Sequence, residues 1–153
     1  MIEIEASEFE ELGSECGDLV PEIRLTDRAR RRIRDRANTN FVARRSGVPI
    51  GFLVGYDEPD GYFYVYLFGV APASRGAGVG SSLFDYLEEW VSKRGLVGIR
   101  LQSRNKYPDM LRLMIRRGYA IVGFEDRGDL DASPIRLEKK TLTPQEDGGR
   151  KDS

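Results

Sequence analysis

Alternating and periodic apolar residues divide this chain into candidate strands and helices. Residues 1–6 alternate apolar with acidic side chains, which is typical of a short edge strand. Three runs rich in β-branched and aromatic residues follow at about 40–45, 48–56 and 62–70, and turn-forming residues separate them. We expect these three runs to form an antiparallel meander.

Four segments have the spacing or the capping residues of helices. Ser7 is suited to cap a brief first helix, because its hydroxyl can accept from a free amide of the first turn. The strongest pattern lies in the third segment, where apolar residues recur three or four positions apart and Gly95 follows the run. The predicted helices cover 7–12, 26–37, 79–94 and 108–117.

Strands are also predicted at 96–103, 119–125 and 134–140. Strands that first cluster and then alternate with helices indicate an α/β (α+β) fold, here a mixed and mostly antiparallel sheet of six or seven strands flanked by about four helices. Residues 1–141 are expected to form a single domain, since a chain of this length suits one core. Residues 142–153 have almost no apolar content and are predicted to be a disordered tail.

Composition removes several kinds of chemistry. The chain has no histidine, so serine-hydrolase triads and His-ligated zinc are excluded. The one cysteine, Cys16, cannot form an internal disulfide or build a zinc site, and we expect it to be a small apolar residue. No metal site is therefore expected.

The chain also lacks the patterns of export and membrane insertion. Residues 1–12 contain neither a positive region nor an apolar stretch of the secretory kind. The longest uncharged stretch, 61–74, is shorter than the roughly 18 apolar residues that a membrane helix needs. We expect a cytoplasmic protein that makes no membrane contact.

The formal net charge of −1 conceals two opposed blocks. Residues 1–23 carry eight acids and no base, whereas residues 24–36 carry seven arginines and two aspartates. The two blocks could pair with each other, or the arginines could face an anionic partner. Nucleic acid is disfavoured as that partner, because the whole chain is slightly acidic and no aromatic residue interleaves with the arginines.

A glycine-rich turn joins the run 62–70 to the third predicted helix. Gly76, Gly78 and Gly80 lack Cβ atoms, so the backbone can curl and direct several amides toward one ligand. The start of a helix adds a partial positive charge, and Arg75 can supply a full one. The spacing fits neither GxxxxGK[ST] nor GxGxxG, so the turn indicates a phosphate cradle of another class.

The string RGAGVG at 75–80 matches the [Gln/Arg]-x-x-Gly-x-[Gly/Ala] signature, and the segment resembles the GNAT superfamily of N-acetyltransferases. The block 105–119 resembles that family's Asn, helix, Gly-Phe block, and the resemblance covers about 40–140. It implies the GNAT fold, acetyl-CoA as cosubstrate, and direct transfer of an acetyl group to a primary amine of a small molecule, peptide or protein in a ternary complex. A monomer or a homodimer would fit the family.

The resemblance also implies roles for individual residues. Phe68 and Val70 would offer main-chain hydrogen bonds to the pantetheine arm, Asn105 would reach the same arm, and the Val70 amide would polarise the thioester carbonyl. Arg75 belongs to the same cofactor-binding segment. The backbone amides expected to bind the pyrophosphate are those of Gly76, Ala77, Gly78, Val79, Gly80 and Ser81.

The proton donor for the departing thiolate is the weakest part of the resemblance. The family often has a tyrosine in the helix before its Gly-Phe block, whereas this chain has Met114. Tyr107 is the nearest substitute and Ser103 is another. The position of Met114 leaves open an alternative, a non-catalytic acyl-CoA-binding sensor or scaffold of the same fold.

The acceptor site is expected in the N-terminal segments and beside the run 62–70. Tyr64 and Tyr66 should share one face of that strand, where they could line an acceptor pocket or pack under a helix. Asp57, Glu58 and Asp60 are expected to solvate a hairpin turn. The arginines of 24–36 suggest selection of a carboxylate- or phosphate-bearing amine or of an acidic protein surface.

Overall fold

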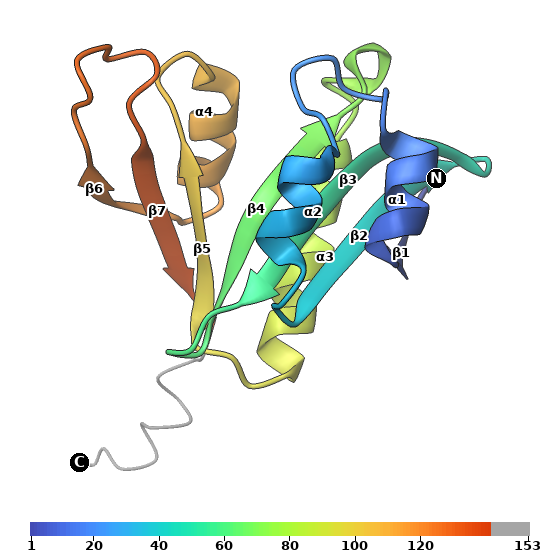
Figure 1. Cartoon of the computed structure of the whole chain (residues 1–153), viewed down its shortest axis with the longest axis horizontal. Coiled ribbons are helices and arrows are strands. Elements are labelled where there is room, and N and C mark those ends of the chain that lie inside the picture. Colours follow the sequence, from blue (N-terminus) through green and yellow to red (C-terminus); the bar gives the residue numbers. More distant parts are fainter. Residues whose placement is uncertain (142–153) are drawn as a thin grey trace. The chain divides into compact units, whose positions relative to one another are not determined.

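A computed structural model describes residues 1–141 and contains seven strands, four α-helices and one 3-10 turn (Figure 1). It divides into two compact units. The first unit comprises Met1–Asp57 and Tyr64–Leu87, and the second comprises Glu58–Phe63 and, of the described residues, 88–141. The predicted tail, 142–153, lies outside the described residues.

The first unit contains the N-terminal elements and the start of the third helix. Its elements are β1 (Ile2–Ser7), α1 (Phe9–Cys16), α2 (Asp27–Ile33), β2 (Asn38–Arg45), β3 (Val48–Asp57), most of β4 (Tyr62–Val70), the 3-10 turn η1 (Pro72–Ser74) and the first part of α3 (Val79–Lys93). The strands follow the order β1-β2-β3-β4, with β1 and β2 both in antiparallel pairs. The predicted edge strand is thus confirmed as β1.

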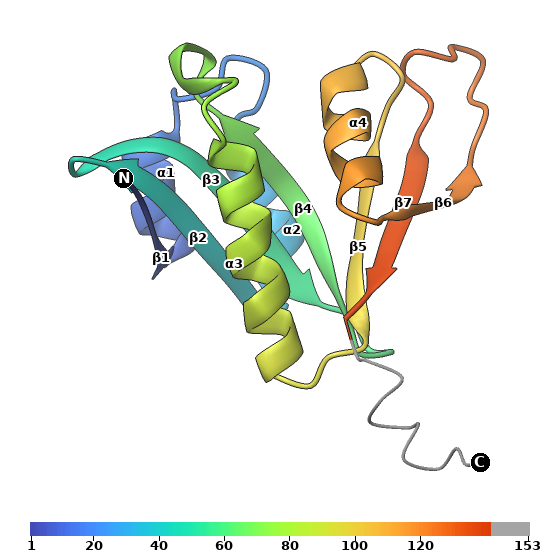
Figure 2. The same ribbon diagram turned by 180° about the vertical axis from the view of Figure 1, so that it is seen from behind.

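Helices cover both faces of the first unit's strands. Helices α1 and α2 lie on one face, and α3 lies on the other (Figures 1 and 2). Beneath α1 and α2 is a cluster of buried apolar side chains that includes Phe9, Leu12 and Phe52. Cys16 belongs to this cluster and is fully buried, which agrees with its expected role as a small apolar residue.

Two glycines let neighbouring elements approach the middle strands of the first unit closely. A Cβ on Gly51 would lie 2.9 Å from Cγ1 of Val79, the first residue of α3. A Cβ on Gly69 would lie 2.8 Å from Cγ2 of Val20, in the segment between α1 and α2. Glycine at these positions therefore sets the separation between the sheet and the segments on its two faces.

The second unit contains β5 (Gly98–Ser103), α4 (Pro108–Arg116), β6 (Ala120–Phe124) and β7 (Ile135–Lys140). Strand β7 pairs antiparallel with both β5 and β6. Arg100 donates to Glu58, Asp60 and Glu138 at 2.7–3.1 Å, so Glu58 and Asp60 pair with an arginine instead of only solvating their turn. Among residues 1–141, no helix is both long and apolar enough to span a membrane.

The predicted boundaries of the first two helices need correction, and the first helix runs to Cys16, four residues beyond its predicted end. Ser7 ends β1, and the first helix begins at Phe9 after Glu8, with no side-chain cap. Ser7 pairs with Asn40 in the β1–β2 ladder, and this pairing takes precedence over its capping propensity. The second helix follows Thr26 as expected but ends at Ile33, four residues earlier than predicted.

Candidate active site

The glycine turn before α3 has the backbone conformation that its sequence predicts. Gly76 and Gly78 have φ angles of +83° and +84°, a region that L side chains rarely adopt. Both are exposed, and a Cβ built on either would meet nothing within 4 Å. The open space in front of these residues fits an approaching ligand.

The first amides of α3 face the same turn. The helical ladder begins where the Ser82 amide donates to the Gly78 carbonyl at 3.0 Å, so the amides of Val79, Gly80 and Ser81 have no partner within the helix. The Ala77 amide makes a long hydrogen bond to the Ser74 carbonyl, at 3.3 Å. Three amides without a helical partner and the positive end of α3 favour an anion at this position.

The alternation of side chains between the two faces of β4 is interrupted just before the turn. Tyr66 packs against the cluster beneath α1 and α2, whereas Phe68, two residues later, makes an edge-to-face contact with Phe84 of α3, with ring centroids 5.0 Å apart. Residues two apart share a face in a regular strand, so the alternation is interrupted between these positions. Leu67 packs against the same cluster as Tyr66, as one extra residue in a bulge would.

A bulge of this kind leaves backbone groups of one strand without partners in the ladder. The interruption adjoins Phe68 and Val70, whose main-chain groups would, by the family resemblance, bind the pantetheine arm. Sequence reasoning missed the bulge, because the run from Tyr62 to Val70 is apolar or aromatic on both faces and its pattern cannot reveal a change of facing. The only local signal was Gly69, a residue that often marks a bulge.

The Arg75 side chain lies against the end of β4. Its Nε donates to the Val70 carbonyl at 3.1 Å, and its Nη2 lies 3.4 Å from Oε1 of Glu22. Hydrogen bonds from the backbone amide of Glu22 and from Arg75 lower the pKa of the Glu22 carboxyl. Arg75 thus joins the strand end to the segment before α2.

Asn105 and Tyr107 belong to the second unit, whereas residues 68–81 belong to the first. Asn105 Nδ2 donates to the Leu130 carbonyl at 3.1 Å and so holds the loop between β6 and β7. Tyr107 precedes α4 and is 39% exposed. Met114, at the position of the expected tyrosine, is fully buried in the core.

Ser103 differs from these residues in its hydrogen bonding. It ends β5, is buried, and its Oγ has no hydrogen-bond partner among residues 1–141. A buried hydroxyl without a partner costs about 1–3 kcal/mol, and such a group in a native structure requires a reason. A bound ligand that supplies the missing partner would be one such reason.

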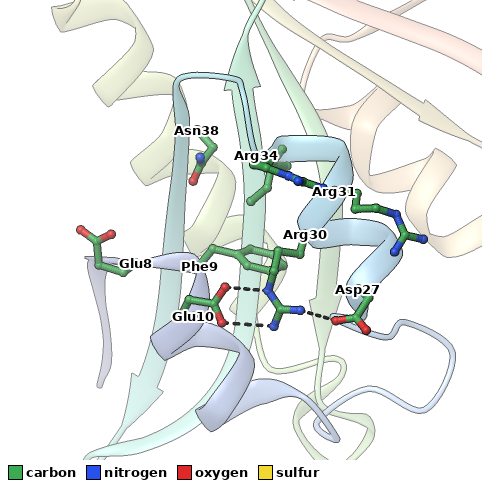
Figure 3. Close-up of a pocket in the computed structure, with 9 residues that line it drawn as sticks. Glu8, Phe9, Glu10, Asp27, Arg30, Arg31, Arg34 and Asn38 are labelled. Atoms are coloured by element: carbon green, nitrogen blue, oxygen red, sulfur yellow. Dashed lines mark hydrogen bonds and ion pairs between the residues drawn. The ribbon is translucent and has the colours of Figure 1, made fainter.

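A separate pocket of about 580 Å³ opens between α1 and α2 (Figure 3). Arg30 crosses it and binds Glu10 at 2.6 and 3.1 Å, and Asp27 on its own helix (Figure 3). The pocket contains none of the predicted cofactor-binding residues, but Arg30, Arg31 and Arg34 of the segment expected to select the acceptor line it. The pair of Arg30 with Glu10 links the two N-terminal charge blocks, and Arg44 and Arg75 bind three more of the acids.

Comparison with known proteins identifies the family. Residues 1–119 match the family model described as the acetyltransferase (GNAT) family. The chain belongs to this family. The match covers more than half of the sequence and includes the glycine turn, and it confirms the resemblance carried by residues 75–80.

Individual relatives agree with this membership. An acetyltransferase of Agrobacterium fabrum is 34% identical over 90 residues, which are 58% of this chain and 64% of that protein's length. The ribosomal-protein-S18-alanine N-acetyltransferase of Escherichia coli has a TM-score of 0.79 at 16% identity, covering 94% of this chain and 96% of its own. A Bacillus subtilis acetyltransferase in complex with CoA has a TM-score of 0.77 at 18% identity, covering 92% and 99%. These likenesses confirm the α+β GNAT fold.

Proposed function

We propose that this GNAT protein transfers an acetyl group from acetyl-CoA to a primary amine, by direct attack in a ternary complex. The observation that carries the proposal is the turn at Gly76 and Gly78, open and exposed, at the start of α3. The CoA bound in the Bacillus subtilis relative supports the choice of ligand. Acetyl-CoA would supply the activated acetyl thioester.

The residues of the turn fit the pyrophosphate of CoA. The amides of Val79, Gly80 and Ser81 have no helical partner, and glycine at 76 and 78 leaves room for the phosphate oxygens. Phe68 and Val70 would present main-chain groups to the pantetheine arm beside the bulge in β4. A donor such as the Val70 amide, aimed at a carbonyl oxygen that gains charge, can contribute about 3–4 kcal/mol to catalysis.

Positioning would supply much of the remaining rate. Holding two reactants in the correct geometry can lower a barrier by about 7–11 kcal/mol, and this needs no imidazole. Tyr107 and Ser103 remain the candidates for the proton that the thiolate takes up, since both carry hydroxyls and Met114 cannot donate. Asn105 would contact the pantetheine arm through the amide oxygen that its bond to Leu130 leaves free.

Calorimetric titration with CoA tests the cradle. Gly78→Glu introduces a side chain and a negative charge at a φ of +84°, and we expect it to abolish binding. Gly95→Glu is the matched control, because Gly95 also has a positive φ and open space but follows the far end of α3. Equal CoA affinity in the two variants would refute the site.

A second variant tests CoA binding without destabilising the fold. Ser81→Asp places a carboxylate in the first turn of α3, where a negative charge stabilises a helix but repels a phosphate. We expect CoA affinity to fall at least tenfold while the melting temperature stays level or rises. An unchanged affinity would contradict an anion site at this turn.

The alternative of a non-catalytic CoA-binding protein is supported by Met114, which cannot donate a proton. Turnover separates the two functions: acetyl-CoA is incubated with a panel of amines and release of free thiol is followed. Thiol release that depends on the amine supports the transferase. CoA binding without turnover of any amine favours the sensor. If an amine is turned over, comparison of the rates of Tyr107→Phe and Ser103→Ala identifies which hydroxyl donates the proton to the thiolate.

A further inference from the structure

Two arginines and three tyrosines form a cluster in the first unit, on the face of β3 and β4 that α1 and α2 cover. The rings of Tyr64 and Tyr66 lie 5.4 and 6.4 Å from the ring of Tyr56, measured between centroids. Arg32 donates to the Tyr56 hydroxyl through Nε at 3.3 Å and Nη2 at 3.0 Å. The Arg36 guanidinium lies 4.7 Å from the centroid of the Tyr56 ring. We call these five residues the Arg32–tyrosine cluster.

The cluster carries two positive charges and no carboxylate. Within residues 1–141, neither Arg32 nor Arg36 makes an ion pair, whereas Arg30, Arg44 and Arg75 each bind a glutamate. Two of the five N–H groups of the Arg32 guanidinium are directed to Tyr56, which leaves three for another acceptor. A planar guanidinium with free donors favours bidentate binding of a carboxylate or phosphate.

Aromatic rings hold this guanidinium in a defined place. Its central carbon lies 4.8 Å from the centroid of Tyr66 and 5.9 Å from that of Tyr56. The Tyr66 ring and the hydrogen bonds to the Tyr56 hydroxyl limit the positions that the side chain can adopt, so an anion would bind without ordering a free arginine. Arg32 nevertheless remains exposed, and Tyr64 and Tyr66 are only partly buried.

Two tyrosines of the cluster, Tyr64 and Tyr66, lie on β4, the strand that leads to the proposed thioester position. Tyr66 precedes Val70 by four residues on β4, a separation of about 13 Å along a strand. Tyr66 also packs toward α1 and α2, whereas α3, whose first turn forms the cradle, covers the opposite face. Val20 and Ile23 pack over Gly69 on this face, so an acceptor at Val70 would extend beside β4, and not over Gly69, to bring its far end to Arg32.

We propose that Arg32 binds an oxyanion, a carboxylate or a phosphate, on the amine acceptor. This proposal rests on the proposed acetyl transfer and deepens it by naming the acceptor class. The amine and the anion would be roughly 10–13 Å apart, about the length of three extended peptide residues. The acceptor is therefore an amine with a remote anionic group, such as a short acidic peptide, and not a free α-amino acid, whose two charged groups are adjacent.

Matched peptides test the proposal. Ala-Gly-Gly-Asp amide is compared with Ala-Gly-Gly-Asn amide, and a phosphoserine peptide with its serine counterpart, in the wild type, Arg32→Gln and Arg30→Gln. We expect the wild type to prefer the anionic member of at least one pair by tenfold or more in kcat/KM, mainly through KM. The pair that shows the preference distinguishes a carboxylate from a phosphate acceptor.

The variants separate anion binding from total charge. Arg32→Gln should abolish the preference, whereas Arg30→Gln removes the same charge from the same helix and should retain it. Arg32→Lys keeps the charge and much of the packing and should restore part of the preference, which a purely structural role for Arg32 does not predict. A wild type without preference, or equal effects of the two Gln variants, would overturn the proposal.

Direct binding keeps this test independent of catalysis. The same peptides are titrated into the complex with CoA, and the ratio of dissociation constants replaces the ratio of kcat/KM. Tighter binding of the anionic peptide that Arg32→Gln abolishes supports the anion site, even where no amine is acetylated and the proposed transfer fails. Equal binding of the two members of both pairs, or no binding of any peptide, rejects the anion site.

Discussion

At position 16 a thiol occupies a place that an aliphatic side chain could fill. Cys16 is fully buried among Phe9, Leu12 and Val20. Burial, and secondly the charge of Glu15, raises the pKa of the thiol from 9.0 to about 11. The folded state therefore holds the thiol proton more tightly than the unfolded state does.

The sign of the resulting pH dependence follows from this difference. The contribution of Cys16 to stability is complete below pH 9 and is lost as the pH rises through 11. We expect the free energy of unfolding, measured with urea, to fall over this interval by about 2 kcal/mol more in the wild type than in Cys16→Ala. The variant is the control for tyrosines and lysines that titrate in the same range.

A reactivity measurement checks the same property without unfolding. At pH 8 a thiol with a pKa near 11 is ionised in about one molecule in a thousand, so a thiol reagent should label the folded protein very slowly. Labelling in denaturant should be rapid. Fast labelling of the folded protein, or parallel pH profiles of the two proteins, would contradict the buried neutral thiol.

Among the elements, β3 and α3 meet at a glycine. A Cβ on Gly51 would lie 2.9 Å from Val79 Cγ1 and 3.1 Å from the Gly69 carbonyl oxygen, and that backbone atom cannot move freely. We expect Gly51→Ala to lower the free energy of unfolding by about 1–3 kcal/mol, because the start of α3 must move away from the sheet. CoA binding should weaken as well, since the Val79 amide is part of the proposed cradle.

Gly13→Ala is the opposite case. Gly13 lies inside α1, and a Cβ there would meet nothing within 4 Å. Alanine is the better helix former, so stability should rise by about 0.5–1 kcal/mol with CoA affinity unchanged. Urea unfolding measures the stability of both variants, and calorimetry measures their CoA affinity. If Gly51→Ala binds CoA as tightly as the wild type, the packing of Gly51 against Val79 does not affect the proposed cradle.

The individual elements also show which features could be predicted from the sequence. The glycine turn was predictable because a positive φ leaves few choices of residue, and Gly76 and Gly78 adopt it. The start of α1 was not, because the capping propensity of Ser7 is local whereas its pairing with Asn40 joins residues 33 positions apart. The bulge in β4 could not be predicted either, because in a run that is apolar on both faces the sequence does not show which face of the sheet each side chain points to.

Across the whole molecule, the sequence shows where charges are concentrated but not which partner each charged side chain contacts. Counting predicted two N-terminal blocks, but the contacts divide the arginines by role. Arg30 pairs with an acid of the first block, whereas Arg32 and Arg36 stack on tyrosines. These tyrosines come from β3 and β4, far from the arginines in sequence, so only the fold distinguishes the three side chains.

Ligand binding should stabilise the whole chain if the cradle is formed only in the folded state. CoA at about one hundred times its dissociation constant should contribute about 2.7 kcal/mol, which raises the melting temperature by roughly 5–10 °C for a chain of this size. Pantetheine lacks the pyrophosphate, and at the same concentration it should produce a much smaller shift, because the amides at the start of α3 would have no anion to bind. Ser81→Asp should reduce the shift with CoA and leave that with pantetheine unchanged. Thermal unfolding followed by circular dichroism measures each shift, and equal shifts with CoA and pantetheine would mean that the turn at Gly76 and Gly78 does not hold the phosphates.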